Sequence, residues 1–292
     1  MEYTLEVENL CKAYADRKFA LKNISFRVNR GTIVGLVGKN GAGKSTTLNT
    51  ILNIINKDSG SVKLFGKEIK DDEVKLRNDI AVVFDIITCH EEFTPQKLEG
   101  IFSDIYINWD SEVFYHFLDK FGVPKDKKIK TLSRGMAMKL SIGIALSHKA
   151  KFLILDEATS GLDPVVREEI LDIFLEFIED ENNAILMSSH ISSELEKVAD
   201  YIIFIDDGSI VLSENKDRLL YEYGIARMKQ GDFNVMDKSE YLAFRKRGLQ
   251  FDALVSNKKL FAKKHQNILV DSTSIDEILS LLAKEKRDER TY

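Results

Sequence analysis

Short apolar runs alternate with polar turns and helical segments from the start of the chain to about residue 214. Residues 4–8 and 20–28 mix apolar with polar positions, which is typical of half-buried strands. The polar segment around Tyr14 predicts a turn between them, and residues 57–60 predict a second turn. Further strands are predicted at the apolar runs 32–37, 61–66, 80–84, 152–155, 184–187, 201–205 and 209–213, the last two forming a hairpin.

The period becomes helical from residue 91 to about residue 123. Thr94 and Pro95 suit the N-cap and first position of a helix, because threonine accepts a free backbone N–H and proline has none to satisfy. We interpret residues 88–150 as an inserted helical subdomain. Two further helices are predicted, at residues 137–148 after an N-cap at Ser133 and at residues 165–179. Strands alternating with helices predict an α/β domain with a largely parallel sheet.

The character of the chain changes at about residue 215. The part from there to residue 292 has a net positive charge, whereas the preceding part is net negative. Residues 267–271 predict a strand, and a helix is predicted from Ser274, with Glu277 completing a capping box. We interpret residues 215–292 as a small accessory α+β domain, and its basic clusters as solvated surface.

Composition narrows the class of protein. The chain has 292 residues, a net charge of −5 and two cysteines, Cys11 and Cys89. Its charge argues against a nucleic-acid partner, and its cysteines suit a reducing cytosol. The N-terminus lacks the pattern of a signal peptide, and no apolar run reaches the ~18 residues of a membrane span. A role at a membrane would therefore require another subunit.

The strongest motif follows the apolar run at residues 32–37. It matches G-x-x-x-x-G-K-[ST], the phosphate-binding loop or Walker A motif. Glycines let successive backbone N–H groups form a concave anion site, and the following helix directs its positive dipole end there. Lysine can then reach the terminal phosphates, and the serine hydroxyl can bind Mg²⁺. The predicted nucleotide-binding residues are Gly38, Lys39, Asn40, Gly41, Ala42, Gly43, Lys44, Ser45 and Thr46.

Acidic residues follow the apolar strand 152–155. Asp156 can order Mg²⁺ and its waters, and Glu157 can polarise the attacking water. His190 follows the next predicted strand and should therefore lie at the same edge of the sheet. A lone histidine is more often structural than catalytic, so its role depends on its neighbours.

The order of these motifs resembles the ATP-binding-cassette (ABC) transporter ATPases over about residues 1–214. Walker A alone would indicate only a phosphate-loop NTPase, whereas the Leu132–Met136 segment (Leu-Ser-Arg-Gly-Met) resembles the family's signature. The resemblance implies a P-loop NTPase core of ABC type, with antiparallel strands at the N-terminal side, the helical subdomain at 88–150 and the C-terminal α+β extension. ATP and Mg²⁺ are the implied cofactors.

The resemblance also implies roles for individual residues. Tyr14 would stack on adenine, while Lys44, Glu157 and His190 would be catalytic. Mg²⁺ would be bound by Ser45 and Asp156, with Asp85 as a further metal residue. Ser133, Arg134, Gly135 and Met136 would contact a nucleotide bound by another subunit, and Asp163 would lie at the dimer seam.

Two residues depart from the family pattern. Arg134 stands where the common signature has glycine, and it adds a positive charge beside the phosphates or at the subunit seam. Asp85 stands where the family normally has glutamine, which reaches Mg²⁺. Aspartate is shorter and cannot donate a hydrogen bond while ionised. We expect Asp85 to approach the metal only in the ATP-bound state.

These observations predict the ATPase subunit of an ABC exporter, attached to separate integral membrane subunits at the cytoplasmic face of the membrane. The departures and the tail resemble exporter ATPases of Gram-positive bacteria that handle antimicrobial or amphipathic toxin peptides. An ATP-dependent homodimer is expected, with a heterodimer as the alternative. The other interpretations are an importer, a soluble ABC ATPase acting on ribosomes or DNA, and a non-hydrolysing regulatory cassette. The presence of both Lys44 and Glu157 argues against the regulatory cassette.

Overall fold

The computed structural model describes residues 3–14, 17–69 and 74–288. An antiparallel sheet in the order β2-β1-β4-β5 forms its N-terminal part. It contains β1 (Tyr3–Tyr14), β2 (Arg17–Asn29), β4 (Ser59–Leu64) and β5 (Lys67–Glu68). Two sequence predictions were wrong here. Tyr14 ends β1 instead of lying in a turn, because it still pairs with Arg17 of β2. Likewise, β4 begins at Ser59, inside the predicted turn, because Ser59 pairs with Cys11.

The central sheet is largely parallel, as the alternation of strands and helices predicted. Its order is β10-β9-β3-β8-β7-β6, and only β10 runs antiparallel to its neighbour. Most side chains of the inner strands are buried, which explains their continuous apolar sequences. The strands are β3 (Ile33–Val37), β6 (Ile80–Val83), β7 (Phe152–Asp156), β8 (Ala184–Ser189), β9 (Tyr201–Asp206) and β10 (Ser209–Asn215).

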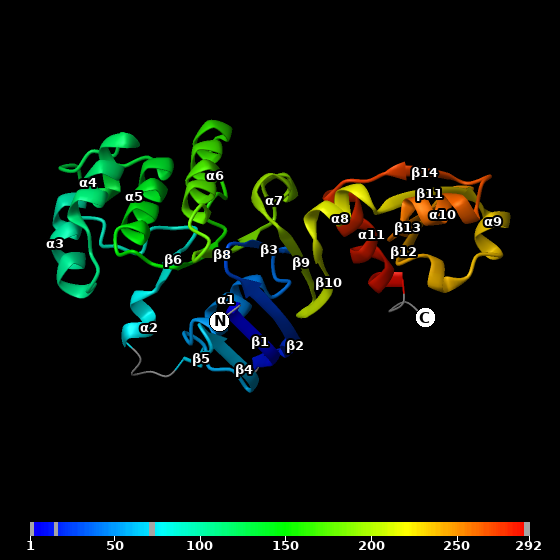
Figure 1. Cartoon of the computed structure of the whole chain (residues 1–292), viewed down its shortest axis with the longest axis horizontal. Coiled ribbons are helices and arrows are strands. Elements are labelled where there is room, and N and C mark those ends of the chain that lie inside the picture. Colours follow the sequence, from blue (N-terminus) through cyan, green and yellow to red (C-terminus); the bar gives the residue numbers. More distant parts are fainter. Residues whose placement is uncertain (1–2, 15–16, 70–73, 289–292) are drawn as a thin grey trace.

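A helical region lies beyond the β6 edge of this sheet (Figure 1). The predicted helical stretch 91–123 consists of two helices, because Asp110 caps a second one by accepting a hydrogen bond from Val113 N. Thr94 caps the first and accepts from Lys97 N, as expected. The helices before residue 215 are α1 (Lys44–Ile51), α2 (Val74–Asn78), α3 (Pro95–Ile105), α4 (Ser111–Lys120), α5 (Arg134–Leu146), α6 (Pro164–Ile178) and α7 (Ser192–Val198), with a 3₁₀ turn at Ile129–Thr131.

His148 joins this helical region to the central sheet. Its Nε2 lies 3.1 Å from the carbonyl oxygen of Ile80 in β6, and its ring stacks on Tyr106 with centroids 4.0 Å apart. Burial lowers the pKa of His148, which favours the neutral ring at neutral pH. The helical region is therefore attached to β6 by a buried polar contact as well as by apolar packing.

The C-terminal part forms a third sheet, antiparallel and ordered β12-β13-β11-β14. Asp252 on β13 is fully buried and pairs with Arg245 at 3.0 Å and Arg247 at 3.2 Å. The basic cluster at 245–247 is therefore partly structural, and the prediction that it is solvated surface is wrong for these pairs. The elements are α8 (Lys216–Tyr221), β11 (Gly224–Lys229), α9 (Gln230–Asn234), β12 (Ala243–Arg247), β13 (Gln250–Val255), α10 (Lys258–Lys264), β14 (Leu269–Ser272) and α11 (Ile275–Asp288), with a 3₁₀ turn at Lys238–Glu240.

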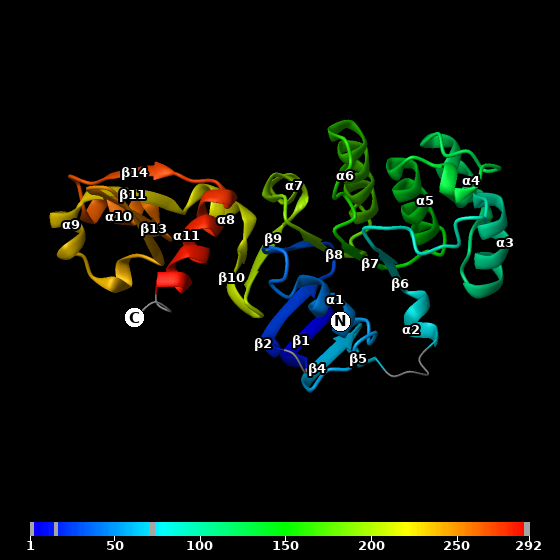
Figure 2. The same cartoon turned by 180° about the vertical axis from the view of Figure 1, so that it is seen from behind.

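Helix α11 attaches this C-terminal part to the part of the molecule before residue 215. Its Ile278 belongs to the same apolar core as Leu195 on α7, and both side chains are fully buried. The backbone N–H of Ile275 donates to Glu196 Oε1 at 3.0 Å, and Ser192 Oγ lies 2.5 Å from Asp276 Oδ1. The C-terminal sheet and the helical region lie at opposite ends of the molecule in both views (Figures 1 and 2).

None of the helices in the ranges 3–14, 17–69 and 74–288 combines the length and apolar character that crossing a bilayer requires.

Candidate nucleotide site

The phosphate-binding loop connects β3 to α1, at the carboxyl edge of the central sheet. Gly38 has no room for a side chain, because a Cβ there would lie 2.4 Å from the carbonyl oxygen of Ile205 in β9. Gly41 and Gly43 have φ values of 80° and 115°, which favour glycine. No side chain caps the first turn of α1. Its free backbone N–H groups are thus available to an anion.

Lys44, Glu157 and His190 form one connected group at this edge. Lys44 is 4% exposed, and its Nζ lies 2.7 Å from Gly38 O and 3.1 Å from Glu157 Oε1. The other oxygen of Glu157, Oε2, lies 3.1 Å from His190 Nδ1. Glu157 has a φ of 50°, a conformation that costs energy for a residue with a side chain. The fold therefore places a lysine, a carboxylate and a histidine in direct contact, although the sequence distributes them over three segments.

A second pair, Ser45 and Asp156, lies beside this group. Ser45 Oγ is 3.2 Å from Asp156 Oδ1. Ser188 on β8 donates to the same carboxylate oxygen at 2.6 Å, and its Oγ accepts the backbone N–H of Glu157 at 3.0 Å. Ser188 thus orients both acidic residues. The sequence assigns Ser188 no role, although its place directly after the predicted strand 184–187, two residues before His190, was a usable signal.

These residues fit Mg²⁺ in the manner usual for this ion. Mg²⁺ prefers hard oxygen ligands, keeps several waters, and takes one or two carboxylates together with substrate phosphates. Ser45 and Asp156 offer a hydroxyl and a carboxylate at the mouth of the phosphate-binding loop. Within the described ranges, no group of three or more His, Cys, Asp or Glu residues forms a metal site made by protein alone. The arrangement suits a metal that is completed by nucleotide and water.

Two predicted residues lie outside these contacts. Asp85 is exposed, two residues past the end of β6, and makes no hydrogen bond or ion pair with the described part of the chain. Val83, two residues before Asp85, pairs with Leu155, which lies two residues before Glu157. Tyr14 is 36% exposed at the end of β1, with Lys12 Nζ 5.9 Å from its ring centre.

The signature residues gather around the start of α5 and α6. Ser133 caps α5, its hydroxyl accepting from Met136 N at 3.2 Å, so its proton remains available for donation. At Gly135, a Cβ would lie 3.1 Å from Val166 on α6, while Asp163 caps α6 through Val165 N and Val166 N. Asp163 and residues 133–136 are therefore neighbours.

Arg134 extends along this same surface. Its guanidinium lies over Gly161, where an added Cβ would be 2.7 Å from Nη1. Gly161 has a φ of 69° and is exposed, as Arg134 is. Across the described residues, no hydrogen bond or ion pair connects 133–136 with the phosphate-binding loop.

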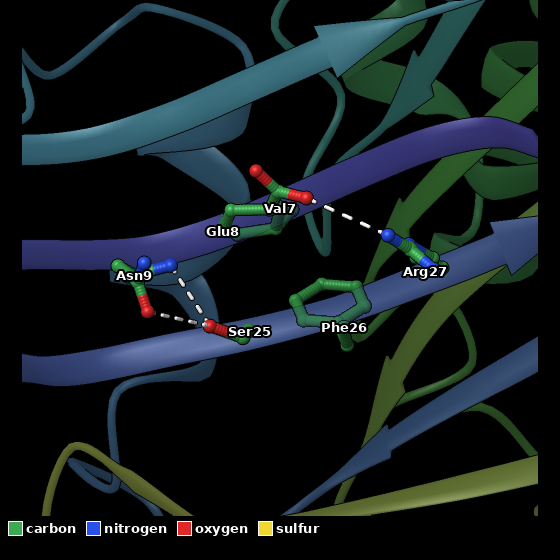
Figure 3. A pocket seen from close by; sticks show the side chains of 6 residues that line it. All are labelled: Val7, Glu8, Asn9, Ser25, Phe26 and Arg27. Atoms are coloured by element: carbon green, nitrogen blue, oxygen red, sulfur yellow. Dashed lines mark hydrogen bonds and ion pairs between the residues drawn. The ribbon is translucent and has the colours of Figure 1, made fainter.

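A separate pocket of about 590 Å³ lies on the N-terminal sheet. Figure 3 shows its lining, in which Asn9 bonds to Ser25, and Arg27 pairs with Glu8 at 3.5 Å. Val7 and Phe26 complete it. None of these residues belongs to the predicted nucleotide site, so this pocket and that site are different places.

The fold and the site together define a class. A phosphate-binding loop lies between β3 and α1, at the carboxyl edge of a mostly parallel sheet, and Asp156 and Glu157 lie at the end of β7. These features define a P-loop nucleotide-hydrolysing protein. Residues 21–160 match the family model described as ABC transporter. The chain belongs to the ATP-binding proteins of the ABC transporter family, and it is an ATPase.

Individual relatives agree with this assignment. The ABC transporter ATP-binding protein YtrB of Bacillus subtilis is 31% identical over 219 residues, covering 75% of this chain and 74% of YtrB. The lantibiotic transport ATP-binding protein SrtF of Streptococcus pyogenes is 34% identical over 220 residues, covering 73% and 91%. The structure of cbiO1 from Clostridium perfringens, part of the ABC transporter complex cbiONQ, matches with a TM-score of 0.65 and 27% identity, covering 75% and 91%.

Proposed function

We propose that this ATPase powers export of antimicrobial or amphipathic toxin peptides through separate membrane-spanning subunits, to which it binds at the cytoplasmic face of the membrane. The contact of Lys44, Glu157 and His190 at the mouth of the phosphate-binding loop is the observation that carries the catalytic part of the proposal. The similarity to a lantibiotic transport ATP-binding protein supports the class of substrate.

The proposed reaction uses the side chains as the structure arranges them. Glu157 accepts the proton of a water that attacks the γ-phosphorus, while the bond from that phosphorus to the bridging oxygen breaks. An entering phosphate competes with Glu157 for Lys44, which would free the carboxylate for this step. His190 is held by Glu157 and contacts the γ-phosphate. Ser45 and Asp156 would hold Mg²⁺, which would supply positive charge to stabilise the phosphate oxygens.

The proposed site is completed by a second subunit. Residues 133–136 lie at the start of α5 and make no polar contact with the phosphate-binding loop of the described chain. A helix N-terminus with a free hydroxyl proton suits a phosphate bound elsewhere. Two copies arranged head to tail would complete two sites, with Tyr14 stacked on adenine and Asp163 at the seam. A heterodimer with another cassette would use the same surfaces.

Attachment to a membrane partner is tested by purification of the tagged chain from membranes of the cells that produce it. We expect an integral membrane protein to co-purify in stoichiometric amount, and to dissociate from the chain only with detergent or denaturant. Recovery of the chain with ribosomes alone, or free of any integral protein, would contradict the transport proposal.

Asp85 is expected to join the metal site when ATP is bound. Asp85→Ala should reduce kcat about tenfold and raise the Mg²⁺ concentration needed for half-maximal activity, because one carboxylate near the metal is lost. Asp104→Ala, which removes an exposed carboxylate from α3, is the matched control and should leave both values unchanged. Unaltered turnover and Mg²⁺ dependence in Asp85→Ala would exclude the proposed role.

A further inference from the structure

Glu194 is a buried carboxylate on α7, four residues after His190, and its side chain is 2% exposed. Its Oε2 accepts hydrogen bonds from Thr159 Oγ1 at 2.7 Å and from Ser189 Oγ at 2.9 Å. Thr159 lies two residues after Glu157, and Ser189 lies directly before His190. One carboxylate oxygen therefore connects the two segments that carry the carboxylate and the imidazole of the site.

The other oxygen of Glu194 is directed to α6. Its Oε1 lies 3.0 Å from Arg167 Nε, and Arg167 Nη2 donates to the carbonyl oxygen of Leu162 at 3.1 Å. Neither Nε nor Oε1 makes a well-aligned hydrogen bond, so their contact is an ion pair. Through Arg167, Glu194 also holds the segment between Ser160 and Asp163.

We propose that Glu194 is a positioning residue for ATP hydrolysis. It touches neither Glu157 nor His190, but it fixes the backbone on which each of them stands, and so maintains the 3.1 Å contact between them. The left-handed backbone at Glu157 needs such support, because this conformation persists only where the surroundings hold it. The inference rests on the proposed roles of Glu157 and His190.

A buried ion pair can also contribute to the stability of the fold alone. The contacts of Glu194 distinguish this structural role from the positioning role. Three of its partners, Thr159, Ser189 and Arg167, belong to or bind the segments at the carboxyl edge of the sheet. Glu194 makes no hydrogen bond or ion pair with the phosphate-binding loop, all of whose residues the structure describes. A positioning role therefore predicts an effect on kcat without an equal effect on nucleotide affinity.

The first test is Glu194→Gln. The amide oxygen can still accept from Thr159 and Ser189, but the charge facing Arg167 is lost. We expect kcat to fall about 30-fold, because small displacements of catalytic groups cost up to about 100-fold in rate. The affinity for a non-hydrolysable ATP analogue, measured by equilibrium binding, should change less than about threefold, since the loop is untouched.

Glu168→Gln is the matched control. Glu168 directly follows Arg167 on α6 and pairs with Lys197 of α7, so it also connects these two helices. Both partners of that pair are about half exposed, and exposed pairs contribute little. Turnover should match the wild type. Loss of kcat in Glu168→Gln as large as in Glu194→Gln would indicate a general effect of α6–α7 attachment and overturn the proposal.

A second pair of variants, with smaller changes in the core, tests the proposal if Glu194→Gln does not fold. Thr159→Val keeps the shape of the side chain and removes the hydroxyl that binds Glu194, whereas Thr159→Ser keeps the hydroxyl. We expect Thr159→Val to lose about tenfold in kcat at unchanged affinity, and Thr159→Ser to recover most of it. Equal kcat in both variants, or parallel losses of affinity and kcat, would overturn the proposal.

Glu157→Gln is measured alongside these variants. If it retains turnover, the catalytic role of Glu157 fails and the positioning role fails with it. If it abolishes turnover while Glu194→Gln and Thr159→Val match the wild type, only the positioning role is wrong.

Discussion

Replacing Glu157 by glutamine is expected to reduce ATP turnover by about 10³-fold while leaving ATP binding intact, because the isosteric amide cannot accept the proton of the attacking water. The amide oxygen can still take the position 3.1 Å from Lys44 Nζ. Steady-state release of phosphate measures turnover, and equilibrium binding of a fluorescent nucleotide measures affinity.

The same variant should accumulate as an ATP-bound dimer. Size-exclusion chromatography with saturating Mg-ATP is expected to show twice the monomer mass, and without nucleotide the monomer. The double variant Lys44→Ala/Glu157→Gln should stay monomeric in both conditions, because Lys44 is needed to hold the phosphates. Turnover within a few fold of the wild type would exclude Glu157 as the base, and a monomer in saturating Mg-ATP would count against a nucleotide clamped between subunits.

The second large effect concerns the division of each site between two chains. Ser133→Asp should abolish turnover, because it directs a carboxylate at the γ-phosphate of the opposite subunit. Aspartate is as good an N-cap as serine, so α5 should remain intact. Lys44→Ala should abolish turnover as well. An equimolar mixture of the two inactive proteins should recover up to about a quarter of wild-type turnover, since half of random dimers are mixed and each holds one intact site.

Thr94→Asp is the matched control for this experiment. It also exchanges one N-cap for another, at the start of α3, where the Thr94 side chain accepts a hydrogen bond from Lys97 N. Its turnover should equal that of the wild type. Full activity of Ser133→Asp alone would show that Ser133 does not contact a nucleotide in trans.

Much of the cassette was predictable because its elements are locally determined. Strands such as β7 are continuous apolar runs, and α3, α5 and α6 begin at the N-caps Thr94, Ser133 and Asp163. Of these three N-caps, Thr94 and Ser133 were predicted from the sequence, but Asp163 was not. The boundaries that were wrong, at Tyr14 and Ser59, are set by pairing with another strand. Local polarity favours a turn there, but inter-strand hydrogen bonds continue the strand.

The phosphate-binding loop, the acidic strand end and the family were predictable, since each depends on residue types at fixed spacing. The packing of the fold decides which of these side chains meet: Lys44 and His190 on Glu157, Ser188 on Asp156, and Glu194 between Thr159 and Ser189. It also placed Arg134 over Gly161 and α11 on α7. The physical reason is that a parallel sheet brings strand ends together from distant parts of the chain, and no local pattern encodes which side chains then come into contact.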